Sequence, residues 1–160
     1  MDSRVEIVLD INVYADVMGR SSVFPEIQEV PPRSGNDSAD ALSIIFDSAR
    51  YRLFLSPHII RNLQEIFLEQ NFTPNLIETY LKFIVELVLE TDGAVVDPPR
   101  DVFDLKDHED NYILDLVKAV DAKILITRDN GLLEQNPWNG RLIVHPADFV
   151  KRHLQSNRIW

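Results

Sequence analysis

Apolar residues gather in five short and nearly continuous runs along the chain. The runs cover residues 5–9, 52–55, 94–96, 123–126 and 142–144. A short apolar run without polar alternation is typical of a strand that is covered on both faces, as the strands of parallel sheets are. The pattern therefore predicts a sheet whose strands are buried between other elements.

Helical patterns fill the segments between these runs. A last helix follows Pro146, and the earlier helices are predicted over residues 38–50, 57–70, 74–90 and 108–120. Strands that alternate with helices imply parallel pairing with right-handed crossovers. The sequence therefore predicts an α/β fold. Because it has no internal repeat and no linker that splits it, we expect residues 1–160 to form a single domain.

Three segments carry additional expectations. Residues 19–37 are rich in Pro, Gly, Ser and Asn and are long for a loop inside a compact domain, so we expect a flexible insertion there. Residues 151–160 are expected to form a C-terminal tail. The helix predicted over 74–90 has a second apolar stripe, and this wide apolar arc indicates burial in the core or at a homodimer contact.

Charge and cysteine content narrow the possible functions. The formal net charge is −10, which argues against a protein that coats nucleic acid through contacts to its backbone. Acidic residues crowd between Asp92 and Asp121, either as a solvated face or as ligands of cations that bind phosphate. The absence of cysteine excludes disulfides and thiolate metal sites and fits a reducing cytoplasm, where we expect the protein. No apolar stretch is long enough to predict a membrane span.

Three aspartates follow or precede predicted strands at places where they can meet. Asp10 comes directly after the first strand, Asp129 comes shortly after the fourth, and Asp110 lies in the first turn of the helix over 108–120. Binding crevices of open parallel sheets lie at the carboxyl ends of the strands. Carboxylates that converge there repel one another unless a cation compensates them, and Mg²⁺ and Mn²⁺ prefer oxygen ligands.

Each aspartate also has a purely structural interpretation. Asp10 can cap a helix that starts at Ile11, and Asp129 can cap the short turn that follows it. Asp110 can be an ordinary acid that the dipole of its helix favours in the first turn. Their joint position at one edge of the sheet favours the metal-binding interpretation.

Several segments resemble the motifs of the PIN-domain family, which includes VapC-type toxins. They begin with Ile7-Val8-Leu9-Asp10-Ile11-Asn12-Val13 and continue with residues 56–63, 107–114, 122–133 and 141–150. The resemblance covers nearly the whole chain apart from residues 19–37. It implies a three-layer α/β/α sandwich around a mostly parallel sheet, and a ribonuclease that depends on Mg²⁺ or Mn²⁺. Many members of the family are toxins that an antitoxin protein holds inactive, and many dimerise.

The resemblance also implies roles for individual residues. Asp10, Asp110 and Asp129 match the positions of catalytic residues that bind the metal or its water. Asn12 and Thr127 match supporting polar groups that orient these acids.

One position departs from the family pattern. The family places a Glu on the second helix where this sequence has Asn62. An amide oxygen brings no negative charge to a cation, so we expect a weaker metal affinity. Glu65 lies three residues further along the same helical side and can compensate if it reaches the site, and Asp107 or Glu109 can also contribute.

These observations leave three hypotheses. The first is an active metal-dependent ribonuclease, the toxin component of a toxin–antitoxin system, with RNA as substrate. The second, motivated by Asn62, is a catalytically weak or inactive PIN-fold module that binds a partner. The third is a phosphatase of the haloacid-dehalogenase type, but that class needs a second Asp two residues after the first, and position 12 is Asn.

Overall fold

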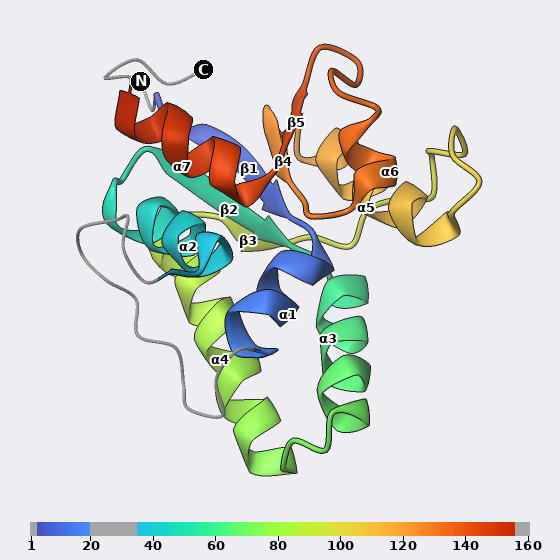
Figure 1. The fold of residues 1–160 in the computed structure, drawn as a ribbon. Coiled ribbons are helices and arrows are strands. Elements are labelled where there is room, and N and C mark those ends of the chain that lie inside the picture. The colour runs from blue at the N-terminus through green and yellow to red at the C-terminus, as the bar shows by residue number, and fades with distance from the viewer. Residues whose placement is uncertain (1–2, 20–34, 156–160) are drawn as a thin grey trace.

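The computed structural model describes residues 3–19 and 35–155, and a parallel sheet lies at the centre of this part of the chain. The sheet has five strands in the order β3-β2-β1-β4-β5, and every neighbouring pair is parallel. The predicted α/β fold with a parallel sheet is confirmed (Figure 1). The strands are β1 (Val5–Leu9), β2 (Tyr51–Leu55), β3 (Ala94–Val95), β4 (Ile124–Ile126) and β5 (Leu142–Val144).

Helices cover the sheet on both faces. The chain runs from β1 to β2 and β3 in one direction and returns to β4 and β5 on the other side of β1. Because such crossovers are right-handed, α1 to α4 lie on one face and α5 lies on the other. The helices are α1 (Ile11–Gly19), α2 (Asp37–Asp47), α3 (Pro57–Glu69), α4 (Pro74–Glu90), α5 (His108–Ala119), α6 (Asn130–Leu133) and α7 (Pro146–Gln155).

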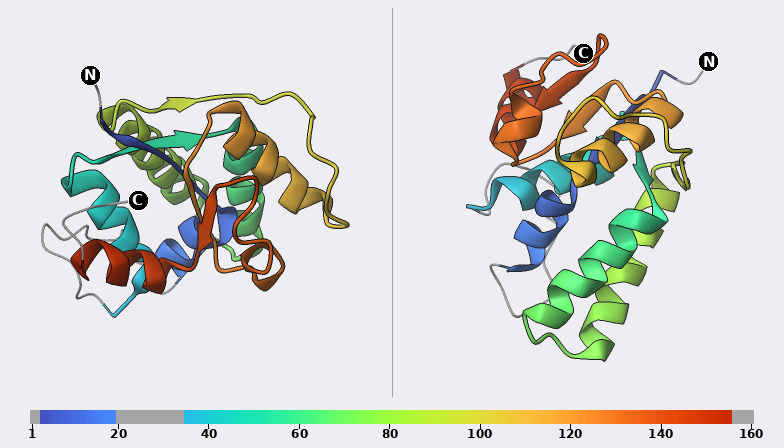
Figure 2. Two further views of the ribbon diagram at one scale, coloured as in Figure 1. Left: turned by 90° about the horizontal axis from the view of Figure 1, so that it is seen from above. Right: turned by 90° about the vertical axis from the view of Figure 1, so that its right-hand side faces the viewer.

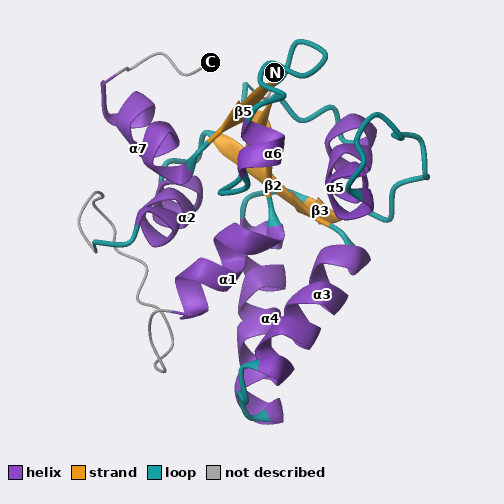
Figure 3. Cartoon of the chain, turned by 45° about the vertical axis from the view of Figure 1, so that its right-hand side comes forward, coloured by secondary structure: helices purple, strands orange, loops and turns teal. Residues whose placement is uncertain are grey.

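The helices α3 and α4 form a hairpin that extends away from the sheet. Figures 1 and 2 show the two helices side by side below the strands, and Figure 3 shows α2 packed beside α7 at another edge of the molecule. Ser56 and Thr73 cap the two helices of the hairpin, and Pro57 and Pro74 take their first positions. The fixed φ of proline and its missing N–H suit this position, so the sequence sets where both helices begin.

The core lies between the middle strands and the helices that cover them. Ile7, Val8 and Leu9 of β1 are completely buried, which agrees with the continuous apolar run that predicted this strand. On the side of α1, the Tyr80 hydroxyl donates a hydrogen bond of 2.9 Å to the backbone oxygen of Tyr14. This bond satisfies a buried polar group and ties α4 to α1.

The end of α4 is held tightly against β2. The Thr91 hydroxyl accepts a hydrogen bond of 2.9 Å from the Leu53 N–H and donates one of 2.8 Å to the Val88 oxygen. Two residues later the backbone of Gly93 approaches β2 so closely that a Cβ at this position would lie 1.7 Å from the Leu53 oxygen. The turn between α4 and β3 therefore requires glycine for its close approach.

The expected insertion and tail fall largely outside the described residues. Of residues 19–37, those from 20 to 34 lie outside, while Asn36 caps α2 and Asp37 begins it. The helix α7 continues to Gln155, so the described part of the expected tail is helical, and residues 156–160 lie outside. Within the part of the chain that is described, no helix is long and apolar enough to cross a membrane.

Candidate active site

An acidic pocket lies at the carboxyl edge of the sheet, where the direction of the strand order reverses. Asp10 follows β1, Asp129 follows β4, and these two strands are neighbours. Such a reversal leaves a crevice between the loops that follow the two strands, and ligands of open α/β sheets bind there. The pocket has a volume of about 680 Å³. Its lining includes Asp10, Asn12, Asp16, Ile66, Asp110, Arg128 and Asp129.

Asp10 is the most deeply placed acid of this pocket. Asp10 is only 6% exposed. Its Oδ1 accepts a hydrogen bond of 2.7 Å from the Ile11 N–H, and its Oδ2 accepts one of 2.7 Å from the Thr127 hydroxyl. Burial raises the pKa of Asp10, although the hydrogen bonds from Thr127 and Ile11 oppose this effect. A cation nearby would favour the charged form of this carboxyl group.

Asn12 and Thr127 connect the ends of β1 and β4 and fix the aspartates. The Asn12 amide donates a hydrogen bond of 3.2 Å to Asp10 Oδ2, and its oxygen accepts one of 3.0 Å from the Arg128 N–H. The Thr127 hydroxyl oxygen accepts a hydrogen bond of 3.0 Å from the Asp129 N–H. The bond between Asn12 and Arg128 and the bond between Thr127 and Asp10 link the end of β1 to the end of β4, and so they hold Asp10 and Asp129 at the same edge.

Asp110 and Asp129 face each other across the pocket. A protonated Asp110 can donate a hydrogen bond to Asp129, and this favours the protonated form of Asp110. Asp129 Oδ2 also accepts a hydrogen bond of 3.0 Å from the Leu132 N–H and so caps α6. Burial raises the pKa of Asp110 to about 7, with further contributions from Asp129, Asp107 and Asp10. The pocket thus concentrates negative charge that the protein alone does not neutralise.

The raised pKa of Asp110 predicts that stability and metal affinity change in opposite directions with pH. Between pH 3.8 and about 7 the folded protein keeps a proton on Asp110 that the unfolded chain releases. Without metal, the free energy of unfolding should therefore fall as pH rises through this window, by about 1 kcal/mol for a carboxyl group screened by water. Mn²⁺ affinity should rise in the same window by up to about tenfold per pH unit, because the proton competes with the cation.

Urea unfolding of the wild type and of Asp110→Asn in the presence of a chelator checks the stability part of this prediction. The variant should be the more stable protein above pH 7, and its stability should lack the fall that the wild type shows. An identical pH dependence in both proteins would contradict the assignment of the titration to Asp110.

Gly131 leaves room for the two facing carboxylates. A Cβ at Gly131 would lie 3.1 Å from Asp129 Oδ2 and 3.7 Å from Asp110 Oδ2. Gly131→Ala should therefore push Asp129 aside and lower Mn²⁺ affinity by roughly tenfold, as the loss of a supporting contact does. The fold should not suffer, because Ala is favoured over Gly in a helix. Calorimetric titration with Mn²⁺ and thermal unfolding check the two parts, and unchanged Mn²⁺ affinity would contradict the expected crowding.

The other predicted residues lie near the pocket but do not line it. Asn62 makes contacts of 2.9 Å with His58 Nε2 and 3.1 Å with Glu109 Oε2. Glu65 is exposed and does not line the pocket, so its expected compensation for Asn62 has no geometric support. The residue of α3 that does line the pocket is Ile66, one turn after Asn62. Asp107 caps α5 and raises the pKa of Asp110 from a distance.

One acid of the pocket, Asp16, was missed by sequence reasoning alone. Asp16 and Arg128 both line it, and their Oδ2 and Nη1 atoms lie 3.4 Å apart. Asp16 follows Asn12 by four residues on α1, so the helical spacing could have indicated that it faces the same side. The pair brings a fourth carboxylate and one guanidinium to the acidic edge.

The side chains present suit a hard divalent cation in their chemistry. Their donors are carboxylate, amide and hydroxyl oxygens, which Mg²⁺ and Mn²⁺ prefer. Asp10 Oδ1 accepts one hydrogen bond from the protein and so keeps a second lone pair for a cation, whereas Oδ2 accepts two. Across residues 3–19 and 35–155, however, no three acidic or histidine side chains are already arranged to hold a metal ion. The donor set fits, and binding would require the carboxylates to move closer together.

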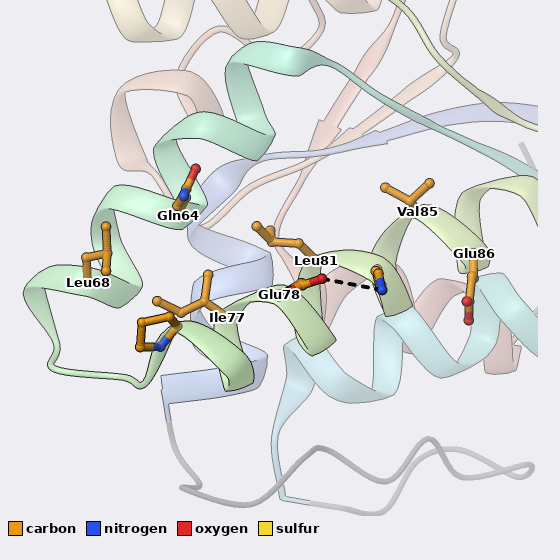
Figure 4. Close-up of a pocket in the computed structure, with 9 residues that line it drawn as sticks. Gln64, Leu68, Ile77, Glu78, Leu81, Val85 and Glu86 are labelled. Carbon is orange, nitrogen blue, oxygen red and sulfur yellow. Dashed lines mark ion pairs between the residues drawn. The ribbon is translucent and has the colours of Figure 1, made fainter.

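A second hollow, between α3 and α4, differs from the acidic pocket in character. It has a volume of about 740 Å³ and is lined mainly by apolar side chains such as Leu68, Ile77 and Leu81 (Figure 4). Glu78 and Lys82 form an ion pair of 3.4 Å along its side. This hollow contains none of the aspartates at the sheet edge, so it has no part in chemistry at that site.

The protein is a parallel α/β domain with carboxylate and amide oxygens gathered where its strand order reverses. These features define a class of domains suited to divalent-metal chemistry. The chain matches the family model described as PIN domain over residues 6–131, and it belongs to the PIN-domain family. Members of this family are generally metal-dependent nucleases, typically bind Mg²⁺ or Mn²⁺, and act on nucleic acid. No curated protein and no solved structure matched the chain.

Proposed function

We propose that the protein is a divalent-metal-dependent endoribonuclease that hydrolyses RNA phosphodiesters at the acidic pocket. The observation that supports this most is the buried Asp10, fixed by Thr127 at the edge where Asp110 and Asp129 also lie. Carboxylates gathered in this way favour cations, and the family is one of metal-dependent nucleases.

In this proposal Asp10, Asp110 and Asp129 hold Mg²⁺ or Mn²⁺, and Thr127 and Asn12 keep them oriented. A bound ion supplies positive charge that offsets the carboxylates, draws the phosphate in and favours attack by water. The raised pKa of Asp110 means that a proton on this carboxyl group would compete with the ion.

Arg128 can add to this charge. It lines the pocket, and its side chain is 28% exposed beside Asp16. A guanidinium group at this place can donate hydrogen bonds to phosphate oxygens. Its ion pair with Asp16 would keep it at the edge of the pocket before the substrate binds.

The proposal extends to a toxin component that an antitoxin protein holds inactive, as the resemblance to VapC-type toxins implies. A homodimer is also proposed. The apolar hollow between α3 and α4 supports the existence of a protein partner, because Leu68 on its rim is 50% exposed and exposed apolar surface often marks protein contacts (Figure 4).

The test is cleavage of single-stranded RNA by the purified protein with Mn²⁺ or Mg²⁺. We expect turnover that a chelator stops and that the metal restores. Turnover that persists in the chelator, or none with either metal, would contradict the proposal.

A second candidate function is a PIN-fold module with weak or no catalytic activity that acts by binding. The contacts of Asn62 favour it, because its amide is engaged with His58 and Glu109 outside the acidic pocket. The family's second-helix carboxylate then has no counterpart in the pocket. Mn²⁺-dependent turnover that is lost in Asp110→Asn would exclude this second function.

A further inference from the structure

A third hollow lies where α3 meets α5, beside the acidic pocket. It has a volume of about 380 Å³, and we call it the arginine pocket after Arg61 and Arg100, which line it with His58, Tyr112 and Asp115. The contact between Asn62 and Glu109 separates the arginine pocket from the acidic pocket. The acidic pocket begins with Asp110, the residue after Glu109, and with Ile66, one helical turn after Asn62. The two hollows therefore lie on either side of this contact.

Arg100 is held in place from two sides. Its guanidinium carbon lies 3.5 Å from the centre of the Tyr112 ring, and its Nη1 lies 3.6 Å from Asp115 Oδ2. The side chain of Asp115 is completely buried, and its Oδ2 makes no hydrogen bond to any described residue. Arg100 therefore forms the ion pair that compensates the buried charge of Asp115, while 39% of the Arg100 side chain remains exposed. Its other N–H groups are available to an anion.

Positive charge at this place contrasts with the acidic chain. Arg61 is exposed and forms no ion pair within the described part of the chain, and the exposed Asp97 is the other acid of the lining. Because Asp115 is buried and already faces Arg100, the accessible surface presents two guanidinium groups and one carboxylate, that of Asp97. Guanidinium groups donate hydrogen bonds to phosphate oxygens in pairs, which makes arginine the preferred residue for phosphate recognition.

Aromatic side chains lie next to these arginines. The rings of His58 and Tyr112 pack against each other at a tilt of 35°, with their centres 4.2 Å apart. Phe103, in the loop before α5, is 69% exposed, and Arg100 lies 5.9 Å from its ring centre. An exposed phenylalanine beside an arginine is a surface on which an unpaired base can stack. A duplex offers no such base, so this surface selects single strands.

We propose that the arginine pocket and Phe103 bind a nucleotide of single-stranded RNA that neighbours the one in the acidic pocket. Arg61 and Arg100 bind its phosphate, and its base stacks on Phe103. The proposal rests on the proposed ribonuclease function and adds to it a substrate class and a second binding site. It needs no metal, so its failure can be separated from failure of the nuclease.

The test is binding of a fluorescently labelled single-stranded RNA in the presence of a chelator, followed by fluorescence anisotropy. Phe103→Ala and Arg61→Ala should each weaken binding by about tenfold, the effect of losing one base stack or phosphate contact. Phe46→Ala and Arg50→Ala are matched controls, because Phe46 lies on α2, Arg50 lies directly before β2, and both are exposed. Figure 1 shows α2 away from α5. Both controls should bind the single-stranded RNA as the wild type does. The wild type should bind a duplex of the same sequence more weakly than the single strand.

Equal weakening by the controls, unchanged binding by both pocket variants, or no binding by the wild type would overturn the proposal. If the protein cleaves RNA with Mn²⁺ but the pocket variants bind RNA as the wild type does, the RNA site in the arginine pocket is rejected and the nuclease function is retained. If RNA binding depends on Phe103 and Arg61 but the protein shows no turnover, the RNA site in the arginine pocket is retained and the nuclease function is rejected.

Discussion

Replacing Asp10 with Asn should lower metal-dependent RNA cleavage by about a hundredfold to a thousandfold, the range seen when one group that stabilises charge in the transition state is lost. Asn has the shape of Asp and keeps an oxygen that can accept the hydrogen bond from Thr127. It removes the negative charge at the most buried position of the acidic pocket. The loss should therefore fall on metal binding and turnover while the fold is kept.

Two comparisons show whether this loss has the expected cause. Asp148→Asn changes an exposed acid in the first turn of α7, and it should cleave RNA at the rate of the wild type. Asp10→Asn should unfold cooperatively at a temperature close to that of the wild type, because loss of the buried charge offsets loss of the hydrogen bond from Ile11, which an amide nitrogen cannot accept. Full activity in Asp10→Asn would remove Asp10 from the catalytic site.

Replacing Gly93 with Ala should give the largest loss of stability, about 3 kcal/mol or more, through overpacking against backbone. The new Cβ would lie 1.7 Å from the Leu53 oxygen and 3.1 Å from the Val88 oxygen. Neither atom can turn away as the end of a side chain can, so β2 and the end of α4 must separate. The hydrogen bonds of Thr91 to both elements would be strained by the same movement.

Urea unfolding monitored by circular dichroism measures this effect, with Gly131→Ala as the matched control. At Gly131 the nearest atom is a carboxylate oxygen of Asp129 at 3.1 Å, which can move. Gly131→Ala should therefore keep the stability of the wild type while Gly93→Ala loses it. Equal stability of the two variants would mean that the turn after α4 can relax and does not need glycine.

The sequence predicted the fold well because the signals it used are local. The continuous apolar run of β1 and the paired signals Ser56-Pro57 and Thr73-Pro74 depend on a few neighbouring residues. The meeting of Asp10 with Asp129 could also be predicted, since the carboxyl ends of parallel strands lie at one edge. Asp110 could be placed there because its helix leads directly into β4.

Other features depend on how helices are rotated against one another, which no local pattern sets. Whether Asn62, Glu65 or Ile66 points into the acidic pocket is decided by the packing of α3 on α1, and the structure places Ile66 there. The arginine pocket joins residues from α3, the loop before α5 and α5 itself. Their approach depends on the course of that loop, for which the sequence carries no periodic signal.

The central claim is that the aspartates at the sheet edge hold a divalent cation, and calorimetric titration with Mn²⁺ above pH 7 tests it most directly. The wild type should bind Mn²⁺ saturably and release the protons that remain on Asp110, and Asp10→Asn should lose this binding. Absence of binding in the wild type, or equal binding in Asp10→Asn, would contradict the claim.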